Sequence, residues 1–266
     1  MSNNRLVAAT IIRNEANNYL RDWLKNIGKI ADYHIFLDDA SDDDTPQIIT
    51  QHLKSHMGEL HQRRTSLFRE NEPTLRGELW EHVRRVSRDG DWILIVDADE
   101  FYDEHLTGIK QKLLDNKFPD VEVVKVSCLD MWNPYDYRID GFWSPLGTDV
   151  RIIRYHDIPF GSTSTRLHMP PYPAQTNTEK NLDVFIPKIH VAYLRDSDKS
   201  RRYEFYTQNV SPVADNLSYR HAMSIMDKNV KLKTYFDFWS NLWAIFHGRR
   251  LYYQIYHTLK KPGDKK

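Results

Sequence analysis

The sequence predicts an α/β fold in which a mixed, mainly parallel sheet is flanked by helices and followed by a helical C-terminal extension. Short apolar runs rich in β-forming residues alternate with segments of helical periodicity over the first half of the 266-residue chain. Two of these runs end abruptly in acidic residues, and the last quarter is aromatic with helical spacing. Because parallel strands need crossover connections, usually helices, this alternation indicates a sheet covered by helices.

The first four elements follow one another closely. Residues 6–12 form an apolar run typical of a strand, and the apolar residues of 17–30 fall at helical spacing. A second strand is predicted over 33–37, and Pro46 begins the next helix because proline is favoured in a first helical turn. A β-α-β-α order is therefore expected at the N-terminus.

The later elements include the most apolar strand of the chain. A helix is predicted over 76–90, closed by Gly90, and is followed by the strand DWILIV, which runs into DADE. The runs VEVVKVSCL and DVRIIRY predict two further strands. The proline-rich stretch 145–187 is expected to form loops over a site, and the chain beyond residue 189 is expected to be helical.

Composition excludes several classes of protein. Lysine plus arginine equals aspartate plus glutamate at 37 each, so no overall field attracts nucleic acid or an acidic membrane. The single cysteine, Cys128, excludes an intrachain disulfide and a multi-cysteine zinc site. No apolar run approaches the roughly 20 residues that span a bilayer. We expect a cytoplasmic protein, with peripheral contact at the inner face of a membrane through the aromatic segment 235–246 as the alternative.

The strongest chemical signal is the pair Asp97 and Asp99 after the strand WILIV. In an extended chain, residues two apart point the same way, so the two carboxylates are expected to converge. Hard oxygen ligands without a nearby cysteine suit Mg²⁺ or Mn²⁺, which commonly also bind substrate phosphates. The alternative is a solvated acidic loop, which is less expected directly after a fully apolar strand.

A weaker signal is the pair Asp38 and Asp39 at the end of the second predicted strand. Carboxylates in this position can accept hydrogen bonds from a base or ribose. The following acidic residues, 42–44, are expected to cap the next helix or to be solvated. His52 and His56, with His61 nearby, have a spacing that can bind zinc, although a solvated helix face is the more common outcome for such a pattern.

Taken in order, these segments resemble the motif set of family 2 glycosyltransferases with the GT-A, Rossmann-like fold. The resemblance is greatest to a bacterial-type subset with Asn-Glu after the first strand and an Asp-Ala-Asp-Glu metal motif, and it spans roughly residues 5–207. The motifs are TIIRNE, FLDDASDDDT, GDWILIVDADEFYDE, VRIIRY followed by STRLHM, and KIHVAYLRDSDKSRRYEFY.

The resemblance implies a donor site for a nucleotide-diphosphate sugar. Its nucleotide-binding edge would include Thr10, Ile12, Arg13 and Glu15. Asp39, with Asp38 beside it, matches the aspartate that contacts the base, and Arg76 resembles an arginine near the diphosphate. Asp97 and Asp99 match the metal motif, with Asp99 the expected direct ligand of Mn²⁺ or Mg²⁺, and His190 resembles a histidine near the metal.

Two departures from the pattern affect the expectations. Ala40 replaces the usual glycine, which is tolerated if its backbone φ is negative. The general base that removes the acceptor proton is not identified by any motif. Asp149 and Asp130 lie at plausible places, and Asp183 is a third candidate. His168, within STRLHM, could reach the acceptor side or be a structural loop residue.

The predicted activity is metal-dependent sugar transfer to an acceptor hydroxyl, with inversion at the anomeric carbon as the resemblance implies. A saccharide or lipid-linked glycan is the favoured acceptor, and a modified DNA base is the alternative. The catalytic domain is expected over 1–195 and the helical extension with its basic tail over 196–266. Nucleotidyl transfer and an inactive nucleotide-sugar-binding module are the rival functions; the first would normally bring a glycine- and lysine-rich phosphate loop, which IIRNEANN lacks.

Overall fold

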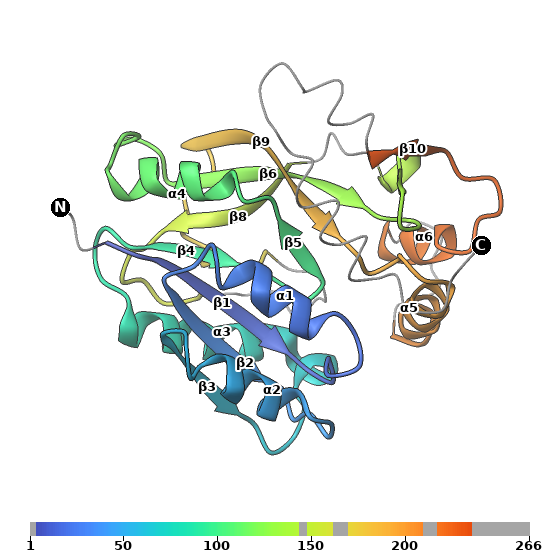
Figure 1. Ribbon diagram of the computed structural model, residues 1–266, viewed down its shortest axis with the longest axis horizontal. Coiled ribbons are helices and arrows are strands. Elements are labelled where there is room, and N and C mark those ends of the chain that lie inside the picture. Colours follow the sequence, from blue (N-terminus) through green and yellow to red (C-terminus); the bar gives the residue numbers. More distant parts are fainter. Residues whose placement is uncertain (1–3, 144–147, 162–169, 210–216, 236–266) are drawn as a thin grey trace. The chain divides into compact units, whose positions relative to one another are not determined.

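The computed structural model describes residues 4–143, 148–161, 170–209 and 217–235 (Figure 1). The chain forms two compact units. The first consists of Met1–Val126 and Thr148–Ile186, and the second of Ser127–Gly147 and Pro187–Lys266. The predicted boundary near residue 195 stays a prediction. No helix in the described part of the chain is long and apolar enough to cross a bilayer.

Parallel strands form the first part of the main sheet. Strand β1 pairs in parallel with β2 on one side and β4 on the other, β3 extends the sheet beyond β2, and β8 joins β4 in antiparallel orientation. The sheet is therefore mixed, as predicted. These strands are β1 (Leu6–Ile12), β2 (Tyr33–Asp38), β3 (Gly58–Gln62), β4 (Trp92–Ile95) and β8 (Thr148–Arg154).

Three more strands complete the main sheet, whose order is β3-β2-β1-β4-β8-β6-β9-β5. They are β5 (Glu100–Tyr102), β6 (Val123–Asp130) and β9 (Asn181–His190). Strands β6 and β9 begin in the first unit and end in the second. In the second unit, β7 (Asp136–Arg138) and β10 (Leu232–Thr234) form a separate antiparallel pair.

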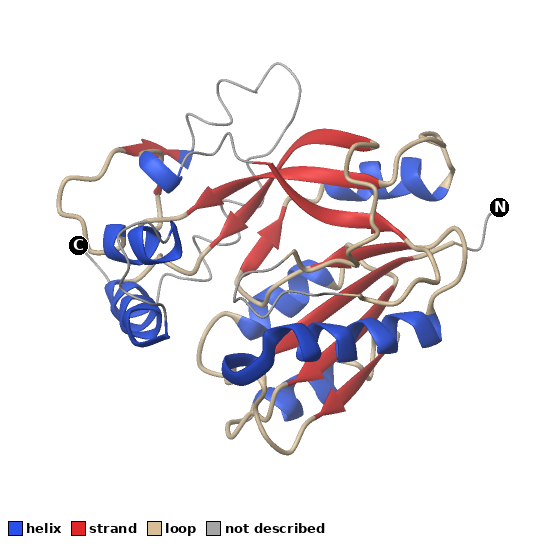
Figure 2. Cartoon of the chain, turned by 180° about the vertical axis from the view of Figure 1, so that it is seen from behind, coloured by secondary structure: helices blue, strands red, loops and turns tan. Residues whose placement is uncertain are grey.

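Helices cover both faces of the parallel strands. Figure 1 shows α1 (Leu20–Ile27) and α2 (Thr45–His52) in front of the sheet, and the reverse view in Figure 2 shows α3 (Phe68–Val86) on the opposite face. Helix α1 buries Leu20, Trp23, Leu24 and Ile27, the helical spacing that predicted it. The remaining helices are α4 (Leu106–Leu114), α5 (Asp196–Asn209), α6 (Leu217–Ser224) and the 3₁₀ turn η1 (Gly141–Trp143).

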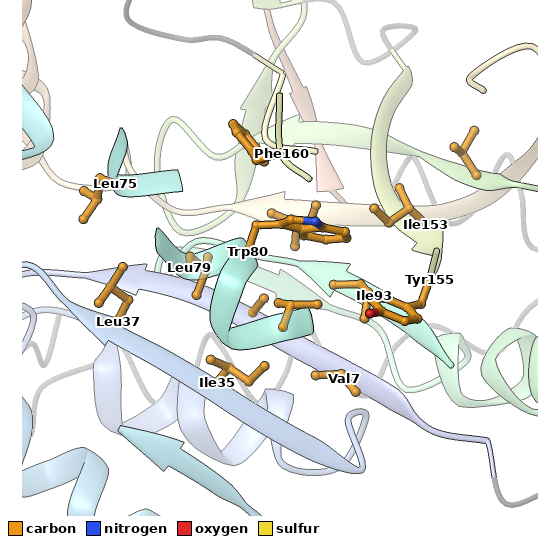
Figure 3. Close-up of a cluster of buried hydrophobic side chains, with 14 residues drawn as sticks. Val7, Ile35, Leu37, Leu75, Leu79, Trp80, Ile93, Ile153, Tyr155 and Phe160 are labelled. Carbon is orange, nitrogen blue, oxygen red and sulfur yellow. The ribbon is translucent and has the colours of Figure 1, made fainter. Parts of the chain in front are cut away.

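The core under α3 follows from strand alternation. Side chains on a strand alternate between its two faces, so the odd-numbered residues of β1, β2 and β4 share one face. These residues pack against the apolar stripe of α3 and against β8 and the segment that follows it (Figure 3). The cluster comprises Val7, Ala9, Ile35, Leu37, Leu75, Leu79, Trp80, Val83, Ile93, Ile95, Val123, Ile153, Tyr155 and Phe160. The even-numbered residues consequently face α1 and α2.

The predicted strands and helices of the first half are confirmed to within a few residues, apart from α3, which begins eight residues earlier than expected. The strand predicted over DVRIIRY is confirmed as β8, whereas the expectation of loops up to residue 187 is wrong at its C-terminal end, because β9 begins at Asn181. Proline removes a ladder donor, and Pro187 lies within β9, whose neighbour β5 has only three residues. Helices α5 and α6 agree with the predicted extension, whereas β10 does not, and residues 236–266 lie outside the described part.

Candidate functional site

The order of the strands locates a point where ligands commonly bind. From β1 the chain passes to β2 and β3 on one side and then returns to β4 on the other side of β1. In open α/β sheets, ligands bind beyond the carboxyl ends of the strands where the connections diverge in this way. The turns after β1, β2 and β4 lie at that edge, and they contain most of the residues predicted for the donor site.

The turn after β4 differs in one respect from the expectation. Strand β4 ends at Ile95, and Glu100 N donates to the carbonyl of Asp97 at 3.1 Å. The Glu100 carboxylate also accepts from Asp97 N at 3.2 Å, so the four residues close into a turn. The inference that Asp97 and Asp99 lie two apart in an extended chain is therefore wrong in its geometry, because the chain bends directly after the apolar strand.

A buried ion pair supports this turn. Arg151 on β8 donates through Nη2 to Glu100 Oε1 at 2.7 Å, and the two side chains are 13% and 2% exposed. Its Nη1 lies 3.9 Å from Asp97, and its Nη2 lies 3.6 Å from Asp149. Burial alone would lower the pKa of Arg151, but attraction to Glu100, then to Asp97, Tyr102 and Asp149, raises it overall. One permanent cation therefore serves three carboxylates.

Helix α1 holds the same turn from the other side. Trp23 donates through Nε1 to the Glu100 carbonyl at 3.0 Å. Asn26 makes two hydrogen bonds to the backbone of Tyr102, through its Nδ2 at 2.8 Å and its Oδ1 at 3.0 Å. The side-chain amide thereby pairs with β5 as a neighbouring strand would. The backbone that follows Asp97 and Asp99 is thus anchored to both a helix and a strand.

The carboxylates after β4 fit a hard divalent cation. The Asp97 side chain is 47% exposed, and its 3.9 Å contact with Arg151 is too long for a hydrogen bond. Asp99 is half-buried. Two carboxylates are a sufficient protein contribution for Mg²⁺ or Mn²⁺ when phosphates and waters supply the rest. The groups of three close potential ligands among the described residues do not include this pair.

The carboxylates after β2 are already engaged by the protein. Asp39 is fully buried and accepts from Ser66 Oγ at 2.6 Å, Leu67 N at 2.8 Å and Phe68 N at 3.1 Å, with Arg63 Nε at 3.6 Å. Asp39 therefore holds the segment in which α3 begins. A carboxylate has about four acceptor positions, and these three donors with Arg63 beside them engage most of the Asp39 carboxylate.

Asp38 has a local role in the same turn. Its carboxylate accepts from the backbone N and the hydroxyl of Ser41. Between them, Ala40 has φ +60°, so the negative φ under which an alanine was expected to be tolerated here is not the one adopted. The left-handed conformation favours glycine, because a Cβ crowds the following carbonyl oxygen. The chain follows the glycine geometry of the motif with an alanine.

The loop after β1 is joined to this acidic turn. Asn14 N donates to Ser41 Oγ at 2.9 Å, Glu15 N to Thr45 Oγ1 at 2.8 Å, and Ala16 N to Asp43 Oδ2 at 3.1 Å. Asp43 therefore bonds to the backbone rather than being solvated. The Asn-Glu element of the first motif is held in place by the second.

Three other predicted donor-site residues lie on β1 or directly after it. Ile12 is buried and accepts from Asp39 N through its carbonyl at 2.9 Å, whereas Arg13 is exposed. Thr10 is 1% exposed, and its hydroxyl has no hydrogen-bond partner among the described residues. A buried hydroxyl without a partner is costly unless a water or ligand completes it.

Arg76, predicted to lie near the diphosphate, is occupied elsewhere in the structure. It donates through Nε and Nη2 to Glu72 Oε1, each at 2.7 Å, one helical turn earlier on α3. Glu72 is buried and Arg76 is 14% exposed, so the pair is shielded from solvent. A phosphate would have to compete with Glu72 for this guanidinium.

The second unit brings together two residues that were predicted for different roles. His190 Nδ1 lies 2.6 Å from Asp130 Oδ1, across the ends of β9 and β6. Cys128, two residues before Asp130, completes a group whose potential ligand atoms all lie within 4.8 Å of one another. A carboxylate that accepts from one imidazole nitrogen directs the other toward a ligand, so Asp130 is arranged to orient His190.

The other candidates for the general base do not belong to this group. Asp183 is exposed on β9, and Asp149, with a 47% exposed side chain, lies beside Arg151. His168 and the rest of STRLHM lie outside the described residues. Arg151 and Glu100 were not among the predicted site residues. Both stand within quoted motifs, and the period-two spacing of Asp149 and Arg151 on one strand would have indicated that they share a face.

Comparison with solved structures gives distant similarities. TarS 1-349 from S. aureus is 13% identical with a TM-score of 0.49, covering 84% of this chain and 69% of that one. The mannosyltransferase PcManGT from Pyrobaculum calidifontis, in complex with GDP-Man and Mn²⁺, is 13% identical with a TM-score of 0.49, covering 86% and 66%. Glucosyl-3-phosphoglycerate synthase from Mycobacterium tuberculosis, with Mn²⁺ and UDP, is 13% identical with a TM-score of 0.44, covering 88% of each chain. The chain spans 42% of a longer TarS chain.

Family assignment rests on the sequence model. No curated protein matches the chain. The model for glycosyl transferase family 2 matches residues 8–201, well over half of the sequence. The match includes the turns after β1, β2 and β4, the Arg151 pair and His190. The chain therefore belongs to glycosyl transferase family 2, and its mixed α/β fold is the GT-A fold of such enzymes.

Proposed function

We propose that the chain transfers a sugar from a nucleotide-diphosphate sugar to an acceptor hydroxyl, with Mn²⁺ or Mg²⁺ at Asp97 and Asp99 and with inversion. The observation that carries this proposal is the turn after β4. There Glu100 takes the strong hydrogen bond of Arg151, while Asp97 stays 47% exposed. The buried pair holds the turn, and the exposed carboxylate is left for a ligand.

The nucleotide would occupy the edge formed by the turns after β1 and β2. The buried Thr10 hydroxyl offers a polar group for a ligand or an ordered water to complete. Asp39, although three donors engage it, is the residue that the family resemblance assigns to the base. The exposed Arg13 and the half-buried Glu15 border the same loop. Within this arrangement, Asp39 positions the start of α3 and at most supplements recognition of the base.

The metal would supply charge stabilisation for the departing diphosphate when bound. Asp97 and Asp99 would hold it, and Arg151 adds a fixed positive charge behind them. His190, which Asp130 orients through Nδ1, keeps its predicted role near the metal or the diphosphate. Asp130 then positions His190, which leaves Asp149 as the general-base candidate.

Asp149 has the exposure that a base needs to reach a hydroxyl, and its carboxylate lies 3.6 Å from Arg151. A base in this position would accept the hydroxyl proton as the new bond to the anomeric carbon forms. The favoured acceptor is a saccharide or lipid-linked glycan, with a modified DNA base as the alternative. Family membership favours sugar transfer over nucleotidyl transfer. Slow donor hydrolysis without acceptor would distinguish an enzyme from an inactive binding module.

The test is a thermal-shift screen of nucleoside-diphosphate sugars with and without Mn²⁺. A ligand at about 100 times its Kd adds about 2.7 kcal/mol to the folded state. At roughly 2–4 °C per kcal/mol, the expected rise in Tm is about 5–10 °C. The rise should need Mn²⁺ and should be lost in Asp99→Asn.

Asp120→Asn is the matched control, because it removes the same charge from an exposed carboxylate in the segment before β6, outside the turns after β1, β2 and β4. It should keep the full rise in Tm. If no nucleotide sugar stabilises the wild type, or if Asp99→Asn responds to donor and metal as the wild type does, the metal assignment is wrong.

A further inference from the structure

A second group of metal-ligating side chains lies on the edge strand of the sheet. Glu59 and His61 are two residues apart on β3, opposite Ile35 and Leu37 of β2, which face α3. Alternation places them on that same face, and α3 supplies His82. Two strands, β2 and β1, separate β3 from β4 and its acidic turn. The group is therefore distinct from the proposed donor site.

The three side chains converge closely. Their potential ligand atoms all lie within 4.8 Å of one another. The imidazole rings of His61 and His82 stack with 3.5 Å between centroids, and His61 Nε2 lies 2.8 Å from Glu59 Oε1. Both of these atoms are buried, yet neither makes a hydrogen bond of acceptable geometry. The 2.8 Å distance is short enough for an ion pair, but the two groups are not aligned for a hydrogen bond. Two buried polar atoms therefore lie side by side without a hydrogen bond.

Such a donor set suits one class of metal ion. Two imidazoles and a carboxylate match Zn²⁺, which binds His nitrogen and carboxylate oxygen at about 2.0–2.2 Å in tetrahedral geometry. Those bond lengths separate neighbouring ligand atoms by about 3.3 Å. The potential ligand atoms are separated by distances from 2.8 Å to at most 4.8 Å, on either side of this value. Small side-chain rotations would therefore bring them to the spacing of a Zn²⁺ site. A water would complete the fourth position. Mn²⁺ and Mg²⁺ prefer oxygen ligands and would favour the carboxylates after β4.

Arg85 competes with a metal for this group. Its guanidinium is hydrogen-bonded to His82 Nδ1, and because arginine is always protonated, His82 is the acceptor. A neutral histidine that accepts at Nδ1 carries its proton on Nε2, so neither nitrogen is then available to a metal. Displacement of the exposed Arg85 side chain frees Nδ1 and removes a nearby positive charge.

We propose that Glu59, His61 and His82 form a Zn²⁺ site that fastens the edge strand β3 to helix α3. An edge strand is paired on one side only, and this link would restrain it from the other direction. Directly after β3, Arg63 lies 3.6 Å from Asp39 and is also paired with Glu78 of α3. The metal would thus stabilise the segment that carries the partner of Asp39.

The test is titration of the full, chelator-treated chain with Zn²⁺ by calorimetry. All proteins would carry Cys128→Ser, because the group of Cys128, Asp130 and His190 could bind Zn²⁺ independently. In this background, His61→Gln combined with His82→Gln should weaken Zn²⁺ binding by more than about tenfold. His156→Gln removes an exposed histidine outside both groups and should leave the affinity unchanged.

Arg85→Gln tests the competition from the opposite direction. It should tighten Zn²⁺ binding several-fold and raise the Tm at a given Zn²⁺ concentration. This variant changes an exposed side chain, so it gives a result even if the double histidine variant does not fold. Equal Zn²⁺ affinity in the parent and the folded double variant, or no tightening in Arg85→Gln, would overturn the proposal.

Discussion

The turns after β2 and β4 both begin with aspartates at the carboxyl end of a strand that pairs with β1, yet the structure uses them differently. After β2, Asp39 is fully buried and accepts three hydrogen bonds from the segment where α3 begins. After β4, Asp97 is half exposed, and Glu100 takes the buried ion pair in its place. The two carboxylates look alike in sequence. Asp39 is structural because backbone donors surround it, whereas Asp97 is available to a ligand because Glu100 pairs with the nearby Arg151.

The largest expected effect comes from exchanging the two carboxylates for amides. Asp39→Asn keeps the shape but turns one acceptor oxygen into an NH₂ group that faces donors from Ser66, Leu67 or Phe68. We expect it to lower the free energy of unfolding by about 2–4 kcal/mol, because buried donors lose their acceptor. Asp97→Asn should change it by less than about 0.5 kcal/mol, as partly exposed substitutions usually do.

Urea unfolding of both variants at one pH measures this contrast. Equal destabilisation would remove the distinction between a structural and an available carboxylate. Sugar transfer should depend on Asp97 more than stability does: relative to the stability that each variant loses, Asp97→Asn should lose more activity than Asp39→Asn. Asp97→Asn should stay folded while transfer falls, because its proposed role is exercised only with donor and metal present.

The pH dependence of stability distinguishes β2 from β4 independently. Strand β4 contains no titratable residue, whereas β2 carries the buried His34, which contacts His52 and His56. Burial, then the neighbouring charges of His52, His56 and Lys110, lowers the pKa of His34 to about 3. Its pKa in the unfolded chain is about 6.5. Between these values the unfolded state binds the extra proton, so stability is complete above pH ~6.5 and falls as the pH drops toward 3.

The expected loss from His34 is up to about 1.4 kcal/mol per pH unit in that window. His52 adds to it, because burial and then His56 lower its pKa to about 4. His34→Leu should therefore flatten the dependence of unfolding free energy on pH between 6.5 and 4. The measurement is a series of urea titrations across this range. An unchanged slope in His34→Leu would show that His34 is already charged in the folded state.

The elements that the sequence predicted have continuous apolar runs or helical stripes. The runs of β1 and β4 are buried from both sides and could be recognised without the structure. Strand β3, GELHQ, has no such run, since its Glu59 and His61 occupy the face toward α3. Strand β5 has only three residues. Edge and short strands depend on their neighbours, and a single sequence does not contain that information.

In the candidate site, the residue types could be predicted from the sequence, but the partners of those residues could not. The acidic residues at strand ends were predictable because each follows an apolar run. Their partners were not, since Arg151 and Glu100 are 51 residues apart and His190 and Asp130 are 60 apart. The geometry of the turns was also hidden. The bend at Asp97 and the positive φ of Ala40 depend on hydrogen bonds that only the folded chain forms, from Asp97 N to the Glu100 carboxylate and from Ser41 N to the Asp38 carboxylate.

Ala40 gives the smallest predicted effect and sharpens the comparison at one backbone position. Its φ of +60° is held by the turn in which Asp38 accepts from Ser41, and a left-handed alanine costs about 1–2 kcal/mol. Glycine relieves this strain but gains freedom in the unfolded chain, which offsets part of the benefit. We expect Ala40→Gly to raise the free energy of unfolding by about 0.5–1 kcal/mol, seen as a higher urea midpoint with an unchanged m-value.

Gly77, on α3, offers the reverse control. Nothing lies within 4 Å of a Cβ added there, so Gly77→Ala should stabilise the protein by about the same amount through helix propensity. If Ala40→Gly destabilises while Gly77→Ala stabilises, the turn after β2 tolerates its alanine without strain, and its shape is set by the Asp38 and Asp39 hydrogen bonds alone.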